Sequence, residues 1–127
     1  MRDETGRGRL RWKLRVTDER CDGIRVLTAV GRLSHATAKD LAVALKEAAT
    51  REPGGLVLDF GQVDYISSAG LLTIEAAASE LGQSQGALVL CSVLDPVRIA
   101  FELAGLLPRF TIEPSRQTAI ARVKSLR

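Results

Sequence analysis

The chain has 127 residues and a formal net charge of +3, with 18 Lys and Arg against 15 Asp and Glu. This length suits one domain, and a composition of 46% hydrophobic and 26% charged residues excludes wholesale disorder. Two Cys and one His are too few for a disulfide framework or for a zinc site built on two imidazoles. No apolar run is long enough to cross a membrane, so we expect a cytoplasmic protein without membrane insertion.

Basic residues are concentrated at the start of the chain. Residues 1–20 hold seven basic and four acidic side chains, whereas residues 21–127 hold eleven of each. A basic arm that contacts nucleic acid is one interpretation. However, residues 9–17 alternate apolar and cationic side chains, which favours a strand with its cations on the exposed face. Neither a recognition helix nor a set of stacking aromatics is evident, so we expect no direct nucleic-acid partner.

The pattern of apolar residues and turn signals predicts nine elements after a flexible tail at residues 1–8, all in a single domain over residues 9–127. Strands are predicted at 9–17, 24–30, 56–60, 87–93 and 108–112, and helices at 36–49, 68–81, from Asp95 to Gly105, and after Ser115. Gly31 is expected to end the second strand, and Ser34 or Thr37 to cap the first helix. Residues 61–67 are predicted to form a loop.

The order of these elements is β-β-α-β-α-β-α-β-α. Strands alternate with amphipathic helices from residue 36 onward, which is typical of a parallel sheet with right-handed crossovers. The turn signal at residues 21–23 joins the first two strands as an antiparallel hairpin. We therefore predict an α/β fold with a mixed sheet of four to five strands flanked by about four helices. The nearly all-apolar run at 56–60 predicts its central strand.

Two adjacent serines mark the segment with the strongest chemical signal. Ser67 and Ser68 follow the central strand and stand at the start of a predicted helix, where the first N–H groups lack partners and the helix dipole is positive. An N-cap is the plainer interpretation of this pair. A phosphate on one of the hydroxyls is the alternative, because its added charge would face free N–H donors.

Other chemical motifs are weaker. The chain has no phosphate-binding glycine loop, and Ile66 stands where the G-x-S-x-G motif would require its first glycine. Asp59 and Asp64 lack a third ligand for a metal, and Cys91 lies in an apolar strand as inert core. No acid–base or nucleophile–base pair is evident, so we expect no enzymatic activity, no metal and no cofactor.

Three segments together resemble the STAS domain, the fold of bacterial anti-sigma factor antagonists. The first is residues 56–60 with 63–71, which is similar to the signature loop of that family. The others are 30–34 with 36–41, which resemble the entry into the family's first helix, and 87–91 with 96–98 and 101–106, which resemble its later strand and helix. The resemblance covers about residues 10–124 in order.

This resemblance implies a phosphorylation-switched binding module. It places Ser68 at the position of the phosphoacceptor, with Ser67 where Asp is usual and therefore as the alternative acceptor; Ser34 also stands where Asp is common. The implied partner is an anti-sigma factor that is itself a serine kinase of the histidine-kinase-like ATPase type. The unphosphorylated antagonist would sequester it and free a sigma factor, and a serine phosphatase would reverse the phosphorylation.

The expected partner surface joins the loop before the first helix to the start of the second helix. Its residues are Arg32, Leu33, Ser34, His35, Asp64, Tyr65, Ile66, Ser67, Ala69, Gly70, Leu71 and Leu72. STAS domains also serve as non-phosphorylated accessory subunits of lipid-transport or stress-signalling complexes. That role is the alternative for this chain.

Overall fold

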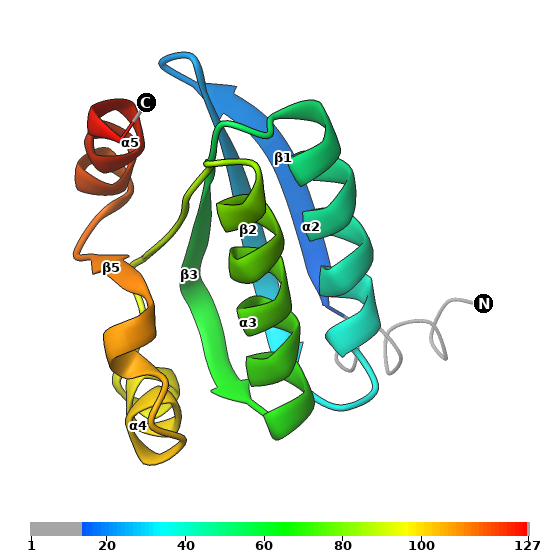
Figure 1. Cartoon of the computed structure of the whole chain (residues 1–127). Helices are drawn as coiled ribbons and strands as arrows, with labels where there is room; N and C mark the ends of the chain where they lie inside the picture. Colours follow the sequence, from blue (N-terminus) through cyan, green and yellow to red (C-terminus); the bar gives the residue numbers. More distant parts are fainter. Residues whose placement is uncertain (1–13, 127) are drawn as a thin grey trace.

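A computed structural model describes residues 14–126, and the predicted tail at 1–8 lies outside the described residues (Figure 1). Five strands form one sheet in the order β1-β2-β3-β4-β5. Their bounds are β1 Arg15–Cys21, β2 Ile24–Leu33, β3 Leu56–Ile66, β4 Leu88–Cys91 and β5 Thr111–Glu113. β1 is antiparallel to β2 and all the other pairs are parallel, which confirms the predicted mixed sheet.

The first strand ends later in the chain than predicted. β1 and β2 form the expected hairpin, and both turn residues, Asp22 and Gly23, have positive φ, as a type I′ turn requires. The prediction of a strand at 9–17 was wrong at its end, because β1 continues through the charged run up to Cys21; residues 9–13 lie outside the described part. At this sheet edge Asp18 pairs with Arg25, so polar residues can occupy successive strand positions.

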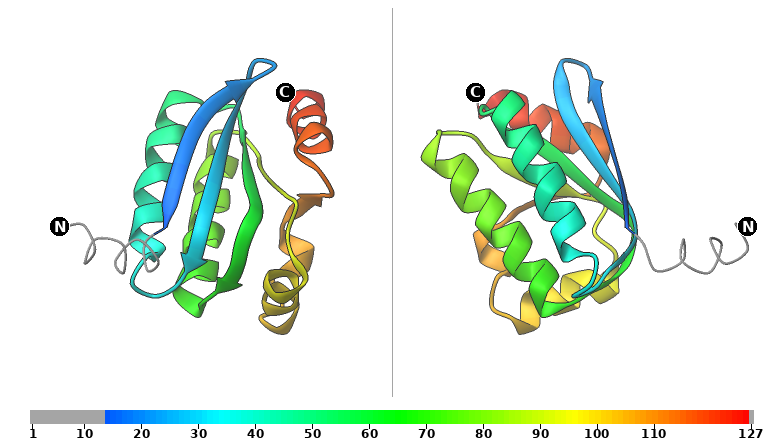
Figure 2. Two further views of the ribbon diagram at one scale, coloured as in Figure 1. Left: turned by 180° about the vertical axis from the view of Figure 1, so that it is seen from behind. Right: turned by 90° about the vertical axis from the view of Figure 1, so that its right-hand side faces the viewer.

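Helices α2 Ala38–Arg51, α3 Ser68–Gln83 and α4 Asp95–Leu103 share one face of the sheet, with a short 3₁₀ turn η1 at Leu107–Arg109. The left view of Figure 2 shows β1, β2 and β3 in front and α2 and α3 behind them. The core between these helices and the sheet holds fully buried aliphatic residues and two aromatic rings, Phe60 and Phe101. Among the described residues, no helix is long and apolar enough to cross a membrane.

Among the described residues, helix α5 Arg116–Ser125 is the only helix on the opposite face of the sheet. Its residues Ala119, Ile120 and Val123 face inward as predicted, and Cys91 of β4 lies in the same small cluster. Burial, with a smaller contribution from Asp59, raises the pKa of the Cys91 thiol to about 11. The thiol therefore stays protonated near neutral pH.

Several predicted boundaries shift by a few residues; the strand predicted at 87–93, for example, is β4 at 88–91. β2 does not end at Gly31 but continues to Leu33, and the helix predicted at 36–49 is α2 at 38–51. The strand predicted at 108–112 is shorter and later, because Pro108 lies in the 3₁₀ turn η1 that precedes β5.

The predicted loop at 61–67 was wrong, because β3 continues to Ile66. Its pairing with β2 shifts twice: Thr28 is opposite Asp59, Gly31 is opposite Val63, and Leu33 is opposite Ile66. Each shift is a β-bulge that inserts one extra residue into β3. The bulges break the strict alternation of apolar and polar residues from which a strand is predicted.

Candidate functional site

The two expected partner-binding segments meet at the carboxyl ends of β2 and β3. The backbone N–H of Ser67 donates to the carbonyl of Leu33 at 2.8 Å and ties the two strand ends together. Both arrowheads point to the bottom of Figure 1, where α2 and α3 begin. The exposed side chains at this end form what we call the β2–β3 rim: Arg32, His35, Asp64, Tyr65, Ser68 and Leu72.

The two serines at the start of helix α3 differ in their hydrogen bonds. Ser67 is the N-cap, with extended backbone, and its Oγ accepts the N–H of Gly70 at 3.2 Å. Ser68 is the first residue of the helix and is exposed, and within residues 14–126 its hydroxyl makes no hydrogen bond. The first turn of α3 contains no acidic residue. The positive end of the helix dipole therefore faces Ser68 without a competing carboxylate.

Gly70 allows α3 to start directly against the two strand ends. A Cβ atom at this position would lie 2.7 Å from Cγ of Leu33 and 2.9 Å from Cγ1 of Ile66. Such distances are well inside van der Waals contact, so any side chain would push the first turn of α3 away from the sheet.

Helix α2 begins in a different way, with its hydroxyl groups turned inward. The Thr37 side chain is buried, and its Oγ1 donates to the carbonyl of Arg32 at 2.7 Å and accepts the N–H of Ser34 at 2.9 Å. Thr37 is the N-cap residue, but its side chain caps no helical N–H, and the carbonyl of Ser34 accepts from Ala38 instead. Thr37 thus closes the loop after β2 and fixes the backbone at Arg32.

An exposed aromatic ring and a cation lie together on the β2–β3 rim. The guanidinium carbon of Arg32 is 4.4 Å from the centre of the Tyr65 ring, a cation–π contact. Tyr65 is 41% exposed and Leu72 is 63% exposed, values that are high for large apolar side chains. Arg and Tyr are enriched among the residues that dominate protein–protein interfaces.

Four of the expected contact residues lie beneath this surface. Leu33, Ile66, Gly70 and Leu71 are buried, so they can support the rim but not meet a partner directly. Ser34, Ser67 and Ala69 are half-buried.

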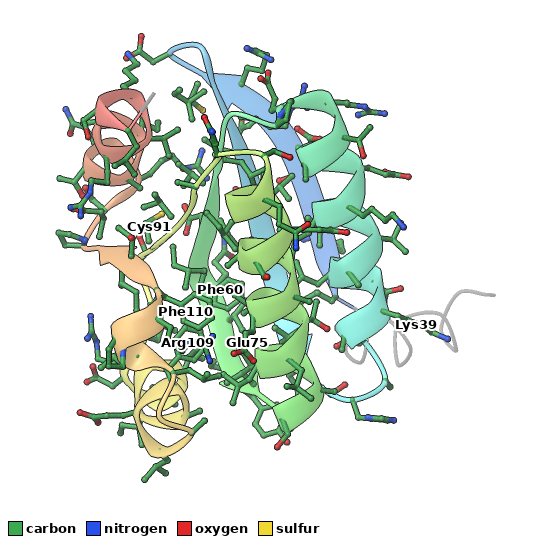
Figure 3. All side chains as sticks on the ribbon, viewed as in Figure 1. Lys39, Phe60, Glu75, Cys91, Arg109 and Phe110 are labelled. Carbon is green, nitrogen blue, oxygen red and sulfur yellow. The ribbon has the colours of Figure 1, made fainter. Side chains whose placement is uncertain are left out.

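An ion pair that could not be predicted from the sequence neutralises the carboxylate of α3 nearest to Ser68. Glu75 lies two turns after Ser68 on the same side of the helix, and its Oε2 is 2.8 Å from Nη1 of Arg109 in η1. Figure 3 shows the two labelled side chains between α3 and the segment after α4. No sequence signal joins residues 34 positions apart in this way. In the described part of the chain, no group of three or more His, Cys, Asp or Glu could hold a metal ion.

Comparison with known proteins identifies the family of the chain. The model of the STAS domain matches residues 15–119. The chain belongs to the STAS domain family. A relative from Bordetella bronchiseptica, named "Putative anti-sigma factor antagonist BtrV", is 37% identical over 112 residues, which cover 88% of this chain and 97% of the relative.

Solved structures agree with this STAS assignment. The crystal structure of an anti-sigma factor antagonist from Mycobacterium paratuberculosis has a TM-score of 0.79 and 26% identity, and the match covers 87% of this chain and 94% of that chain. SpoIIAA from Bacillus shares the fold in two states at 20% identity. Its unphosphorylated form has a TM-score of 0.73 over 87% of this chain and 97% of its own, and its phosphorylated form 0.65 over 86% and 99%.

Proposed function

We propose that this STAS domain is an anti-sigma factor antagonist that docks through the β2–β3 rim and is released when Ser68 is phosphorylated. The partner is an anti-sigma factor that is also a serine kinase of the histidine-kinase-like ATPase type. The observation that carries the proposal is the state of the Ser68 hydroxyl, which is exposed at the first position of α3 and free of hydrogen bonds within the described residues.

The choice of Ser68 over Ser67 follows from their hydrogen bonds. A kinase must reach the hydroxyl and remove its proton while the γ-phosphoryl group of ATP is transferred to Oγ and ADP leaves. The Ser67 hydroxyl is half-buried and engaged by the N–H of Gly70, so its phosphorylation would cost the cap of α3. Ser68 can be modified without the loss of any such contact.

The folded domain can carry a phosphate on Ser68, whereas an interface formed over the β2–β3 rim cannot accommodate it. A phosphoserine carries a charge of about −1.5 to −2 at neutral pH, and at the first turn of α3 this charge meets free N–H groups and the positive end of the helix dipole. A docked protein would instead have to bury the same charge beside Tyr65 and Leu72. An unpaired charge in an interface costs several kcal/mol.

The wild-type protein, Ser67→Ala and Ser68→Ala are incubated with ATP and the purified serine kinases of the histidine-kinase-like ATPase type from the same organism, one at a time. Mass spectrometry then counts the phosphates, and a binding assay measures partner affinity. We expect one phosphate on the wild type and on Ser67→Ala, none on Ser68→Ala, and loss of binding only where the phosphate is present. Full incorporation into Ser68→Ala would move the site to Ser67. No incorporation into the wild type would favour a non-phosphorylated accessory subunit.

A further inference from the structure

A polar network on the α5 face connects three strands to one arginine. Arg116, the first residue of α5, donates from Nη1 to Glu19 of β1 at 2.9 Å and from Nη2 to Thr28 of β2 at 2.7 Å. Its Nε donates to Oδ2 of Asp59 in β3 at 3.1 Å. Partial burial acts to lower the pKa of Arg116, but the hydrogen bonds to Glu19 and Asp59 outweigh it and raise the pKa.

This network lies where the first bulge of β3 begins. Thr28 and Asp59 are the last paired residues before the register between β2 and β3 shifts. The second carboxylate oxygen of Asp59, Oδ1, accepts the N–H of Gly61 inside the bulge at 2.9 Å. Arg116 thus binds both strands at their last regular pair and holds the carboxylate that fixes the bulged residue.

The bulge determines where the β2–β3 rim is placed. If β2 and β3 kept the register of the Thr28–Asp59 pair, Leu33 would lie opposite Asp64. The two bulges instead bring Leu33 opposite Ile66. A shift of one residue exchanges the two faces of a strand. The orientation of Tyr65 and the bond between Ser67 and Leu33 therefore depend on both extra residues being kept in place.

We infer that Arg116 is a positioning residue for the docking surface: by holding Asp59 at the first bulge, it fixes the register of the second half of β3. This inference deepens the proposed function and rests on it only where partner binding is concerned. The register of β3 itself can be tested in the protein alone.

The test compares Arg116→Ala with two control variants in the same helix. Arg122→Ala removes another arginine ion pair, to Glu113, without touching Asp59. Val123→Ala removes a fully buried side chain under α5 and so lowers stability without touching the network. Arg116→Lys keeps one charge but cannot reach three strands at once.

The first measurement is backbone amide NMR of the free proteins. We expect Arg116→Ala to speed hydrogen exchange at the Gly61 amide about tenfold and to shift the amide signals of residues 62–68, with Arg116→Lys in between and both controls unchanged there. Shifts confined to α5 would overturn the inference. This result does not depend on any partner.

The second measurement is affinity for the purified anti-sigma factor from the same organism that the proposed function names as the partner. Arg116→Ala should bind about tenfold more weakly, while Arg122→Ala and Val123→Ala stay within about twofold of the wild type. An equal loss of affinity in Val123→Ala would show that Arg116 affects binding only through overall stability, and would contradict the inference. If the wild type itself does not bind, the proposed function fails, and the amide measurement still decides the role of Arg116.

Discussion

Helices α2 and α3 both begin at the carboxyl end of a parallel strand, yet of the two only α3 has an exposed hydroxyl that makes no hydrogen bond within the described residues. At α2, Thr37 turns inward to the carbonyl of Arg32, and an acidic residue, Asp40, lies in the first turn. At α3, Ser67 supplies the cap, no acid follows, and Ser68 remains exposed. The two helix starts thus differ in structure, because the hydroxyl groups at α2 make hydrogen bonds, whereas the Ser68 hydroxyl at α3 makes none within the described residues.

The largest expected effect is on partner binding when a charge is added at the start of α3. Ser68→Asp should weaken affinity for the anti-sigma factor by about 100-fold or more, because its carboxylate would be buried unpaired in the interface. The melting temperature should hold or rise slightly, since a carboxylate at a helix N-terminus contributes about 0.3–1 kcal/mol. Calorimetric titration and thermal denaturation measure the two effects.

The matched control is Ser79→Asp, which adds the same charge to an exposed position of α3 far from its start. It should leave affinity within about twofold. Equal losses in both variants would mean that total charge, and not the start of α3, governs docking.

The next largest effect is on stability and concerns the tight packing of the first turn of α3 against the ends of β2 and β3. Gly70→Ala places Cβ against Leu33 and Ile66 and should lower the free energy of unfolding by about 1–3 kcal/mol. Gly82→Ala, later in the same helix, meets no atom within 4 Å and should be neutral or stabilising by up to about 1 kcal/mol. Urea denaturation of both variants measures the difference. Similar values for the two would show that the first turn of α3 is not held against the strand ends.

A smaller loss of stability is expected when the hydrogen bond from Thr37 to the carbonyl of Arg32, before α2, is removed. Thr37→Val removes the buried hydroxyl and leaves the carbonyl of Arg32 without its donor, at a cost of about 1–2 kcal/mol in unfolding free energy. Thr50→Val removes an exposed hydroxyl that bonds within α2 and should change stability by less than about 0.5 kcal/mol. Chemical denaturation of the two variants measures the difference. A loss of unfolding free energy no larger for Thr37→Val than for Thr50→Val would show that the Thr37 hydroxyl does not stabilise the start of α2.

The smallest effect separates the two serines of α3. Ser67→Ala loses the cap and should cost about 1 kcal/mol of unfolding free energy. Ser68→Ala loses no hydrogen bond within the described residues and should stay within about 0.5 kcal/mol of the wild type. Differential scanning calorimetry resolves the two; the reverse order would show that Ser68 is the structural serine.

The apolar pattern predicted most of the fold. Strands that are almost entirely buried, such as 56–60, are visible as apolar runs, and the inward stripe of α3 is visible as a helical periodicity. The start of α3 at Ser68 was predicted at the correct residue. The end of β1 was missed because both faces of an edge strand can remain polar. The second half of β3 was missed because its bulges place Asp64 and Tyr65 side by side on the surface.

The candidate site was predictable in location but not in detail. Two segments that each follow a strand and precede a helix were expected to meet at one end of the sheet, and the Ser67–Leu33 bond joins them there. The exposure of Leu72 and the burial of Leu71 follow from helix phase, which the sequence suggests only roughly. The contacts of Arg116 with Glu19 and Asp59 span 97 and 57 positions and carry no local signal.

The central claim is that a charge at Ser68 ends docking while the fold persists. The most direct measurement is a calorimetric titration of the anti-sigma factor with Ser67→Ala protein phosphorylated at Ser68, against the same protein without phosphate. If this claim is correct, we expect an affinity loss of about 100-fold or more on phosphorylation. Equal affinities within about twofold, with full phosphate occupancy at Ser68 established by mass spectrometry, would contradict it.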